Sequence, residues 1–285
     1  MPISISFAKA SGAGNDFVVV NNMNGRYSLD QASLARSLCS RHTGIGADGL
    51  LVLEPSGKAD FRMIYYNADG SHGGMCGNGG RCIALFAMLS GIVGMQCRFE
   101  ALDYVYEAKI NIETVELKMK NPSDFRRGLQ VKLGESQYEC HRVNTGAPHV
   151  IIFVDELESV DVQDLGQRLR NHAFFQPEGT NVNFVKKLGR NTIAIRTYER
   201  GVEAETLACG TGSIASAVVA SLVHNMEFPI VVQARSGENL RIYANKAGEI
   251  ITNIVLHGPA KILFTGNVLY DTASGAIVSS TKVNE

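Results

Sequence analysis

The sequence has none of the bulk features that mark a membrane-bound or nucleic-acid-binding protein. It contains no tryptophan and no long run of basic residues, and its net charge is only −1. It also has no apolar stretch of about 18 residues, the shortest length typical of a membrane-spanning helix. The charge balance gives no electrostatic support for binding nucleic acid or an anionic membrane. We therefore expect neither a nucleic-acid partner nor a membrane partner.

The N-terminal segment, residues 1–9, lacks a charged stretch followed by an apolar one, so it does not resemble a secretory signal peptide. We therefore expect a cytoplasmic protein whose thiols stay reduced. The six cysteines fit a disulfide framework poorly, because such frameworks are typical of short secreted chains. The spacing of Cys76 and Cys82 is not a usual zinc-ligand spacing, so no metal site is predicted.

What the sequence does contain is an ordinary globular composition with an excess of glycine. Of 285 residues, 45% are hydrophobic, 19% are charged and 29 are glycine, against a usual glycine share of roughly 7%. The chain is long enough to bury a core without disulfides or metals. At roughly 150 residues per domain, its length predicts about two domains.

Two parts of the chain resemble each other. The run Cys76–Gly79 (CGNG) recurs as Cys209–Gly212 (CGTG), 133 residues later, and each is followed by small and apolar residues. Four more pairs recur in the same order at offsets of 131 to 134 residues: Ser11–Ala13 with Thr145–Ala147, Asp30 with Asp161, Gly46–Asp48 with Gly179–Asn181, and Asn67–Gly70 with Tyr198–Gly201. Two long copies do not make a solenoid, so we infer a duplicated domain.

Both halves predict the same order of elements. Each begins with a strand and an amphipathic helix, at Gln31–His42 and Val162–Asn171, with Asp30 and Asp161 as N-caps. Strands follow, and then a Cys-Gly run with a helix that is apolar on nearly every side and should be buried. We predict an α+β (mixed α/β) fold of two pseudo-symmetric domains from an internal duplication. Each would be a curled sheet around a central helix, with the crossing near Asn121–Asp124.

The two Cys-Gly runs begin helices, where backbone N–H groups are unsatisfied and the helix dipole is positive. This position lowers a thiol pKa from about 8.5 toward neutrality. The N–H groups of Gly77-Asn78 and of Gly210-Thr211 can also bind an anion such as a carboxylate. For a single loop, a buried structural cysteine is the more common alternative. Two equivalent loops favour a ligand site, because pseudo-symmetry can bring both to a cleft between the domains.

Two thiols at one small molecule have two chemical uses. They can form a redox disulfide, or they can invert the configuration of a carbon atom. In an inversion, a thiolate removes a proton from one face and a thiol returns one to the opposite face. The N–H groups of the helix N-termini then stabilise the charge that develops on the adjacent carboxylate.

Seven runs of the sequence carry a resemblance to a known family. They are Gly12–Phe17 (GAGNDF), Arg41–Gly49 (RHTGIGADG), Asn67–Ser71 (NADGS), Met75–Cys82 (MCGNGGRC), Thr180–Phe184 (TNVNF), Tyr198–Gly201 (YERG) and Thr206–Gly212 (TLACGTG). Together, in this order and over nearly the whole chain, they resemble the diaminopimelate epimerases. The resemblance implies a cofactor-independent interconversion of LL- and meso-2,6-diaminopimelate, a small-molecule substrate used in lysine and peptidoglycan synthesis.

The resemblance also implies a domain division. The C-terminal strand would return to the first domain, so that residues 1–121 and about 270–285 form one domain and residues 122–269 the other. The active site would lie in the cleft between them. The sequence does not fix the oligomeric state and allows a homodimer.

Site residues follow from the same resemblance. It implies Cys76 and Cys209 as the acid–base pair, and His149 and Glu199 as residues that support the thiol pKa. The implied substrate-binding residues are Asn15, Asn67, Gly77, Asn78, Asn181, Glu199, Arg200, Gly210 and Thr211. Among these, Arg200 suits the distal carboxylate and Glu199 an ammonium group.

Plainer alternatives exist for several of these residues. Glu199 and Arg200 can form a surface ion pair, His149 can be a structural histidine, and asparagines beside glycines are often turn residues. Two positions depart from the family's pattern, which often has Gln at Gly49 and Asn at Ala147.

Two other functions stay open. The proline racemase group resembles this architecture and also uses paired cysteines. It tends to carry His in place of Asn78, however, and an acidic residue with Ser-Pro in place of Thr206–Ala208. The second is a non-catalytic amino-acid-binding protein with inert cysteines.

Overall fold

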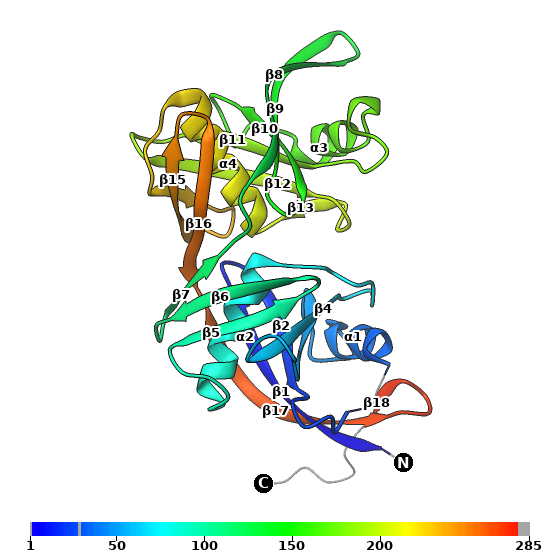
Figure 1. Ribbon diagram of the computed structural model, residues 1–285. Helices are drawn as coiled ribbons and strands as arrows, with labels where there is room; N and C mark the ends of the chain where they lie inside the picture. The colour runs from blue at the N-terminus through cyan, green and yellow to red at the C-terminus, as the bar shows by residue number, and fades with distance from the viewer. Residues whose placement is uncertain (1, 28–29, 279–285) are drawn as a thin grey trace. The chain divides into compact units, whose positions relative to one another are not determined.

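The computed structural model describes residues 2–27 and 30–278 (Figure 1). Its helices are α1 (Gln31–Cys39), α2 (Gly77–Leu89), α3 (Val162–Arg170) and α4 (Gly210–His224), with a 3₁₀ turn at Ala173–Phe175. None of the helices in this part of the chain is long and apolar enough to cross a lipid bilayer. Strands make up the rest of the regular structure.

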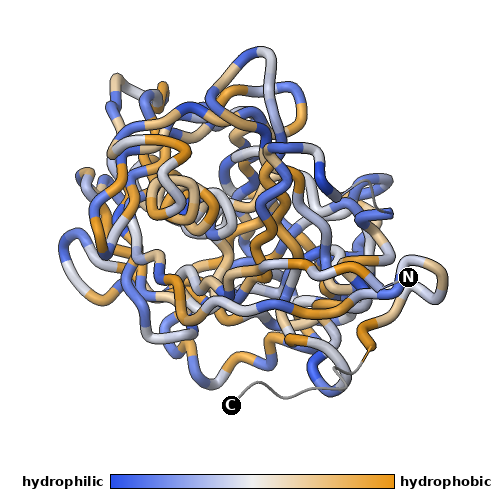
Figure 2. The backbone as a smooth tube through the Cα atoms, turned by 90° about the horizontal axis from the view of Figure 1, so that it is seen from below, coloured by the Kyte–Doolittle hydropathy of each residue, from blue (hydrophilic) through white to orange (hydrophobic). Residues whose placement is uncertain are grey.

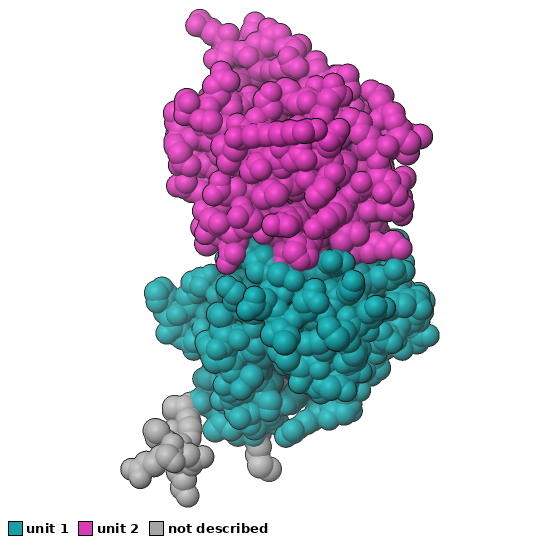
Figure 3. Space-filling view, turned by 90° about the vertical axis from the view of Figure 1, so that its left-hand side faces the viewer, with its two compact units in different colours: residues 1–117, 259–285 teal, residues 118–258 magenta. Residues whose placement is uncertain are grey.

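The chain divides into two compact units, which Figure 3 colours separately. Unit 1 consists of Met1–Leu117 and Pro259–Glu285, and unit 2 of Lys118–Gly258. The sequence predicts a return to the first domain at about residue 270, whereas the structure has it at Pro259. The difference arises because strand β17 (Lys261–Asp271) pairs with β1 (Ile3–Gly12) along nearly its whole length.

Unit 1 is built on one sheet. From its edge, the strands are β18 (Ala276–Val278), β17, β1, β2 (Asn15–Asn21), β3 (Gly49–Glu54), β4 (Phe61–Asn67), β5 (Gln96–Ala101) and β6 (Tyr104–Ile110). The β2–β3 and β4–β5 pairs are parallel, and the other pairs are antiparallel. Strand β7 (Thr114–Lys118) follows β6 in the chain.

Unit 2 repeats this arrangement. Its strands are β8 (Ser123–Leu133), β9 (Ser136–Asn144), β10 (Pro148–Phe153), β11 (Asn181–Lys187), β12 (Thr192–Glu199), β14 (Ile230–Gln233), β15 (Asn239–Ala247) and β16 (Ile250–Pro259), with β13 (Ala204–Thr206) added beside β12. The parallel pairs are again the third and fifth elements of the series, β10–β11 and β12–β14.

The register of the two sheets matches as well. Phe17 lies opposite Gly49 in unit 1, and Val150 lies opposite Val182 in unit 2, so both partners are displaced by 133 residues. The same strand order, strand sense and register confirm the duplicated fold that the sequence repeat predicts.

Each sheet curls around one apolar helix. Helix α2 packs against β17, β1, β2, β3, β4 and β6, and α4 packs against β9, β10, β11, β12, β14 and β15. Both helices are buried on nearly all sides, as their composition predicts. Glycine permits the close approach in unit 1, because a Cβ at Gly12 would lie 2.9 Å from Cys82 Sγ. Figure 2 shows apolar segments along the interior and hydrophilic residues in many outer turns.

Helices α1 and α3 cover the opposite faces of the two sheets. Leu34 and Leu38 of α1 pack against Val18, Leu50 and Val52, the residues that alternate with those facing α2. The predicted N-caps are confirmed. Asp30 accepts a hydrogen bond from Ala32 N (3.1 Å), and Asp161 accepts one from Asp164 N (3.0 Å).

The β8–β9 hairpin is absent from the elements predicted from the sequence. Its first strand is mostly exposed and polar, and its pairing with β9 is interrupted between Ser123 and Arg126 and again between Arg126 and Leu129. A strand with neither a buried face nor a regular register leaves no alternating apolar pattern to detect.

Candidate active site

Cys76 and Cys209 are the N-cap residues of α2 and α4. Their backbones are extended in the same way, with φ/ψ of −112°/121° at Cys76 and −125°/111° at Cys209. Each sulfur accepts a hydrogen bond from the backbone N–H three residues later, Gly79 N or Gly212 N, at 3.4 Å. Donors of this kind at the positive end of a helix dipole favour the thiolate form.

Four backbone N–H groups predicted to bind substrate belong to the first turns of these helices. Gly77 and Asn78 open α2, and Gly210 and Thr211 open α4. N–H groups in the first turn have no acceptor within their own helix. Each cysteine loop therefore presents a sulfur and anion-binding donors together.

In unit 1, a chain of side chains fixes the Cys76 loop. Arg81 Nη2 donates to Asn78 Oδ1 (2.9 Å), Asn78 Nδ2 donates to Asn15 Oδ1 (2.6 Å), and Asn15 Nδ2 donates to Asp48 Oδ2 (3.0 Å). Asn78 and Arg81 are both fully buried. The structure thus brings Asn15 and Asn78 into direct contact, and it uses the Asn78 side chain to hold the loop.

Asn67 ends β4 on the sheet face that carries α2. It lies opposite Gly49, which in turn lies opposite Phe17, and its Nδ2 donates to Ser71 Oγ (2.9 Å). A Cβ at Gly49 would lie 2.5 Å from a ring carbon of Tyr65. The departure from the family's pattern at Gly49 therefore has a physical reason, because the Tyr65 ring occupies the space of a side chain.

In unit 2, Cys209 is joined to a buried polar network. Cys209 Sγ is 3.5 Å from Thr211 Oγ1, which is 3.0 Å from His149 Nε2. His149 Nδ1 is 3.1 Å from Asn183 Nδ2. The same Nδ2 also donates to Val150 O (3.1 Å), while Asn183 Oδ1 accepts from Thr197 Oγ1 (3.0 Å).

This network fixes the tautomer of His149. The contact with Val150 O identifies Nδ2 of Asn183 as a donor, so His149 Nδ1 accepts and Nε2 carries the proton. His149 Nε2 then donates to Thr211, whose hydroxyl can donate to a Cys209 thiolate or accept from a Cys209 thiol. Burial, with a smaller contribution from the charge of Arg200, lowers the pKa of His149 to about 3. His149 therefore acts on the thiol through a neutral hydrogen-bond relay.

The other predicted pocket residues of unit 2 lie at neighbouring strand ends. Asn181 lies opposite His149, donates to Pro148 O (3.1 Å) and accepts from Arg200 N (2.9 Å), so it ties these segments together. Glu199 accepts from Thr206 Oγ1 (3.0 Å). The half-buried Arg200 donates from Nη1 to Glu178 O (2.8 Å).

Three residues of these networks have no role in the sequence analysis: Arg81, Asn183 and Thr197. A signal for Asn183 exists, because Asn181 and Asn183 alternate with the apolar Val182 and Phe184 and must share one face of the strand. Arg81 stands in the CGNGGRC run, but sequence alone does not show that its guanidinium is buried.

The remaining cysteines are buried and free: Cys39, Cys82, Cys97 and Cys140. Burial raises the pKa of each to about 12, so they stay protonated at neutral pH. Among residues 2–27 and 30–278, no group of three or more His, Cys, Asp or Glu side chains is arranged to hold a metal ion.

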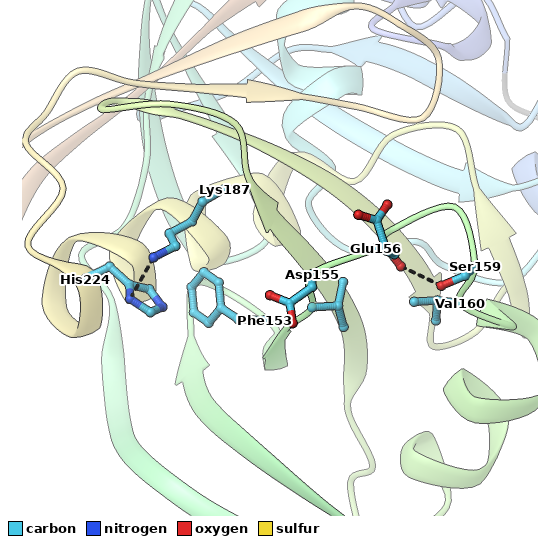
Figure 4. A pocket seen from close by; sticks show the side chains of 8 residues that line it. Phe153, Asp155, Glu156, Ser159, Val160, Lys187 and His224 are labelled. Atoms are coloured by element: carbon cyan, nitrogen blue, oxygen red, sulfur yellow. Dashed lines mark hydrogen bonds between the residues drawn. The ribbon is translucent and has the colours of Figure 1, made fainter.

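A pocket of about 470 Å³ lies elsewhere in unit 2 (Figure 4). Phe153, Asp155, Lys187 and His224 contribute to its lining. His224 is the last residue of α4, so the pocket lies about 22 Å along the helix from Cys209. It is therefore distinct from the site around the Cys209 loop.

Comparison with known proteins gives consistent matches. The family model described as diaminopimelate epimerase matches residues 7–124 and 142–263. A diaminopimelate epimerase of Chlorobaculum tepidum is 47% identical over 262 residues, covering 90% of this chain and 99% of that protein. One from Aquifex aeolicus is 39% identical over 276 residues, covering 93% and 98%.

Solved structures with the same fold are more distant in sequence. A phenazine biosynthesis protein of the PhzF family from Bacillus anthracis has a TM-score of 0.75 at 14% identity, covering 94% of this chain and 99% of that one. A hydroxyproline epimerase from Agrobacterium vitis has a TM-score of 0.72 at 15% identity, covering 98% and 95%. At such identities the similarity is one of fold alone.

Proposed function

The chain belongs to the diaminopimelate epimerase family, and we infer that it interconverts LL- and meso-2,6-diaminopimelate in lysine biosynthesis. One observation of the structure carries this inference. Each unit places a cysteine at the N-cap of its central helix, with matching backbone angles and the same sulfur hydrogen bond. Two such thiols suit an inversion of configuration that needs one base and one acid.

We propose that Cys76 and Cys209 act on opposite faces of one α-carbon. The thiolate takes the α-proton, and the electron pair of the C–H bond delocalises into the adjacent carboxylate. The thiol then gives its proton to the other face and becomes the thiolate. One negative charge passes from one sulfur to the other, so the proton balance closes without a cofactor.

The first-turn N–H groups would stabilise the charge on that carboxylate. Those of Gly77 and Asn78 and those of Gly210 and Thr211 point outward from the positive ends of two helices. Their positions are fixed before substrate binds, by the side-chain networks of Asn78 and Thr211, so they need little reorganisation during the reaction.

Recognition of the far end of the substrate would fall to Arg200 and Glu199. One nitrogen of the Arg200 guanidinium donates to Glu178 O, and the others are suited to a bidentate carboxylate. Glu199, held by Thr206, suits the distal ammonium group. Asn15, Asn67 and Asn181 would complete the pocket through the amide groups at their strand ends.

We propose that the enzyme works in the cytoplasm on this small molecule, with no nucleic-acid or membrane partner. The mechanism needs one free thiolate and one free thiol, which a reducing compartment maintains. A homodimer is compatible with the proposal, since both cysteine loops come from one chain.

The test is an exchange reaction in deuterated water. Purified enzyme without added cofactor or metal should interconvert the two isomers and introduce deuterium at the α-carbon. Cys76→Ala and Cys209→Ala should each lower the rate at least about a thousandfold, because each removes a proton-transfer group. Cys97→Ala, which removes a buried thiol outside both loops, is the matched control and should remain active.

Two outcomes would contradict the proposal. If either loop variant retains near-normal epimerisation, the two-thiol mechanism is wrong. If the enzyme epimerises proline or hydroxyproline in preference to diaminopimelate, the substrate assignment is wrong, and if it binds an amino acid without any exchange, it is a binding protein.

A further inference from the structure

Arg81 is a buried cation without a carboxylate partner. Its side chain is 0% exposed. Its three acceptors are all neutral: Asn78 Oδ1 (2.9 Å), Gly77 O (3.3 Å) and Pro259 O (3.3 Å). Within the described part of the chain it forms no ion pair with an aspartate or glutamate. A buried charge of this kind is costly unless a counter-ion lies nearby.

The nearest ionic cluster of unit 1 does not supply that counter-ion, because its charges cancel. Lys9 pairs with Asp16 (2.7 Å), and Arg41 pairs with Asp16 (3.1 Å) and with Asp48 (2.7 Å). Two cations and two carboxylates leave no net charge. Asp48 reaches Arg81 only through the neutral amides of Asn15 and Asn78.

The other strands around α2 add no unpaired carboxylate on its side. Strand β6 turns the apolar body of Tyr106 inward and leaves Glu107 and Lys109 exposed. On β4 the exposed Arg62 pairs with Glu100 of β5 (3.2 Å). Strand β3 ends at Glu54, which accepts from Asn22 and Gln31, and β17 contributes the exposed Lys261.

Two thiols lie close enough to Arg81 to interact with its charge, those of Cys76 and Cys82. Cys82 is fully buried, and burial raises its pKa to about 12. Cys76 is half-buried, accepts the N–H of Gly79 and sits at the positive end of α2. Cys76 is therefore the group that can balance the charge of Arg81 by losing its proton.

Unit 2 has no equivalent cation in this position. The residue 133 positions after Arg81 is Ile214, which is apolar and fully buried in α4. Cys209 instead contacts the Thr211 hydroxyl, backed by a His149 that is neutral. A neutral hydroxyl serves a thiol and a thiolate equally well.

We propose that Cys76 is the resting thiolate of the pair, with Arg81 as its buried counter-ion, and that Cys209 is the resting thiol. This rests on the proposed function only in taking the two cysteines as one acid–base pair. Arg81 is then a positioning residue that both shapes the loop, through Asn78 and Gly77, and sets which sulfur carries the charge.

The direct test titrates each thiol alone, without substrate. Cys209→Ser leaves Cys76 as the reactive thiol, and Cys76→Ser leaves Cys209. The pH dependence of alkylation by iodoacetamide, together with the ultraviolet absorbance of the thiolate, gives each pKa. Cys76 should titrate at least about one pH unit below Cys209, and at a pH below both values it should react at least about tenfold faster.

Arg81 is tested in the same two backgrounds. In the Cys209→Ser protein, Arg81→Gln should raise the Cys76 pKa by about one to two units, while Arg81→Lys, which keeps the charge, should raise it less. In the Cys76→Ser protein, Arg81→Gln should leave the Cys209 pKa nearly unchanged. A merely structural role for Arg81 would not separate Gln from Lys in this way.

Several results would overturn the assignment. A Cys76 thiol that titrates at or above Cys209 contradicts it, and this comparison holds even if the Arg81 variants do not fold. An Arg81→Gln shift equal to the Arg81→Lys shift removes the role of charge. The titration uses no substrate, so a failed diaminopimelate assay with a low Cys76 pKa would count against the proposed function alone.

Discussion

At the scale of single residues, His149 makes stability depend on pH. Its folded pKa of about 3 lies below the unfolded value of about 6.5, so the unfolded chain binds the proton first as the pH falls. The stability that His149 contributes is fully present above about pH 7 and is lost as the pH falls toward 3. We expect a loss of about 2 kcal/mol between pH 7 and pH 5 from this residue.

Urea unfolding at a series of pH values checks this expectation. The variant His149→Gln has no imidazole to titrate, so its free energy of unfolding should fall less between pH 7 and pH 5 than that of the parent. Equal slopes for the two proteins would show that His149 is accessible to protons in the folded state. The acid limb of the activity profile should likewise belong to another group, since folded His149 stays neutral there.

The residues that could be predicted from the sequence are those with a local signature. Cys76 and Cys209 stand out because each precedes glycines and an apolar helix. Asn183 and Arg81 lack such a signature, because their importance comes from burial and from partners distant in the chain, such as Thr197 and Pro259. Burial of an arginine depends on packing that no local pattern records.

At the scale of elements, the N-termini of α2 and α4 differ in how tightly they are packed. A Cβ at Gly212 would lie 2.4 Å from Asn183 Oδ1 and 3.2 Å from Cys209 Sγ. A Cβ at the equivalent Gly79 would meet only a methyl of Leu51 at 3.1 Å as its nearest atom. The Asn183 amide is fixed by several hydrogen bonds, whereas a leucine methyl can move.

Gly212→Ala should therefore be much more harmful than Gly79→Ala. We expect Gly212→Ala to cost about 1–3 kcal/mol in the free energy of unfolding and to lower kcat at least about tenfold, because it displaces the Asn183–His149 relay. Gly79→Ala should change stability by less than about 1 kcal/mol, since the helix propensity of alanine offsets the contact. Thermal unfolding and the exchange assay measure both, and equal effects would contradict the packing argument.

Elements with a strong period could be predicted, and elements without one could not. Helices α1 and α3 follow from leucines spaced to face the core and from aspartate N-caps. Strand β17 was visible as a strand, but its pairing with β1 joins residues more than 250 positions apart, which no local pattern reveals. The exposed β8–β9 hairpin has no buried face and hence no signal.

At the scale of the whole molecule, duplication has produced two similar loops in different electrostatic surroundings. The backbone of each cysteine loop is conserved between the units to within a few degrees to about 13° in φ and ψ, so both offer the same geometry to a ligand. The side chains behind them differ, with Arg81 in one unit and Ile214 in the other. A two-base inversion needs this combination of similar geometry and unequal protonation.

The two-base mechanism also predicts sensitivity to oxidation. If both thiols serve one α-carbon, they approach each other when no substrate separates them, and a mild oxidant such as diamide should join them in a disulfide. Activity should fall and return on addition of dithiothreitol. The other four cysteines should be spared, because they are buried and their pKa values of about 12 leave almost no thiolate.

Peptide mapping under non-reducing conditions identifies the bond, and bound substrate or either serine variant, Cys76→Ser or Cys209→Ser, should prevent it. A disulfide requires the two Cα atoms to come within about 7 Å of each other. Full activity after prolonged oxidation, with no cross-linked peptide, would mean that the thiols never come that close. One α-carbon could then not lie between them during the reaction, and the mechanism would need a second acid or base from within a single unit.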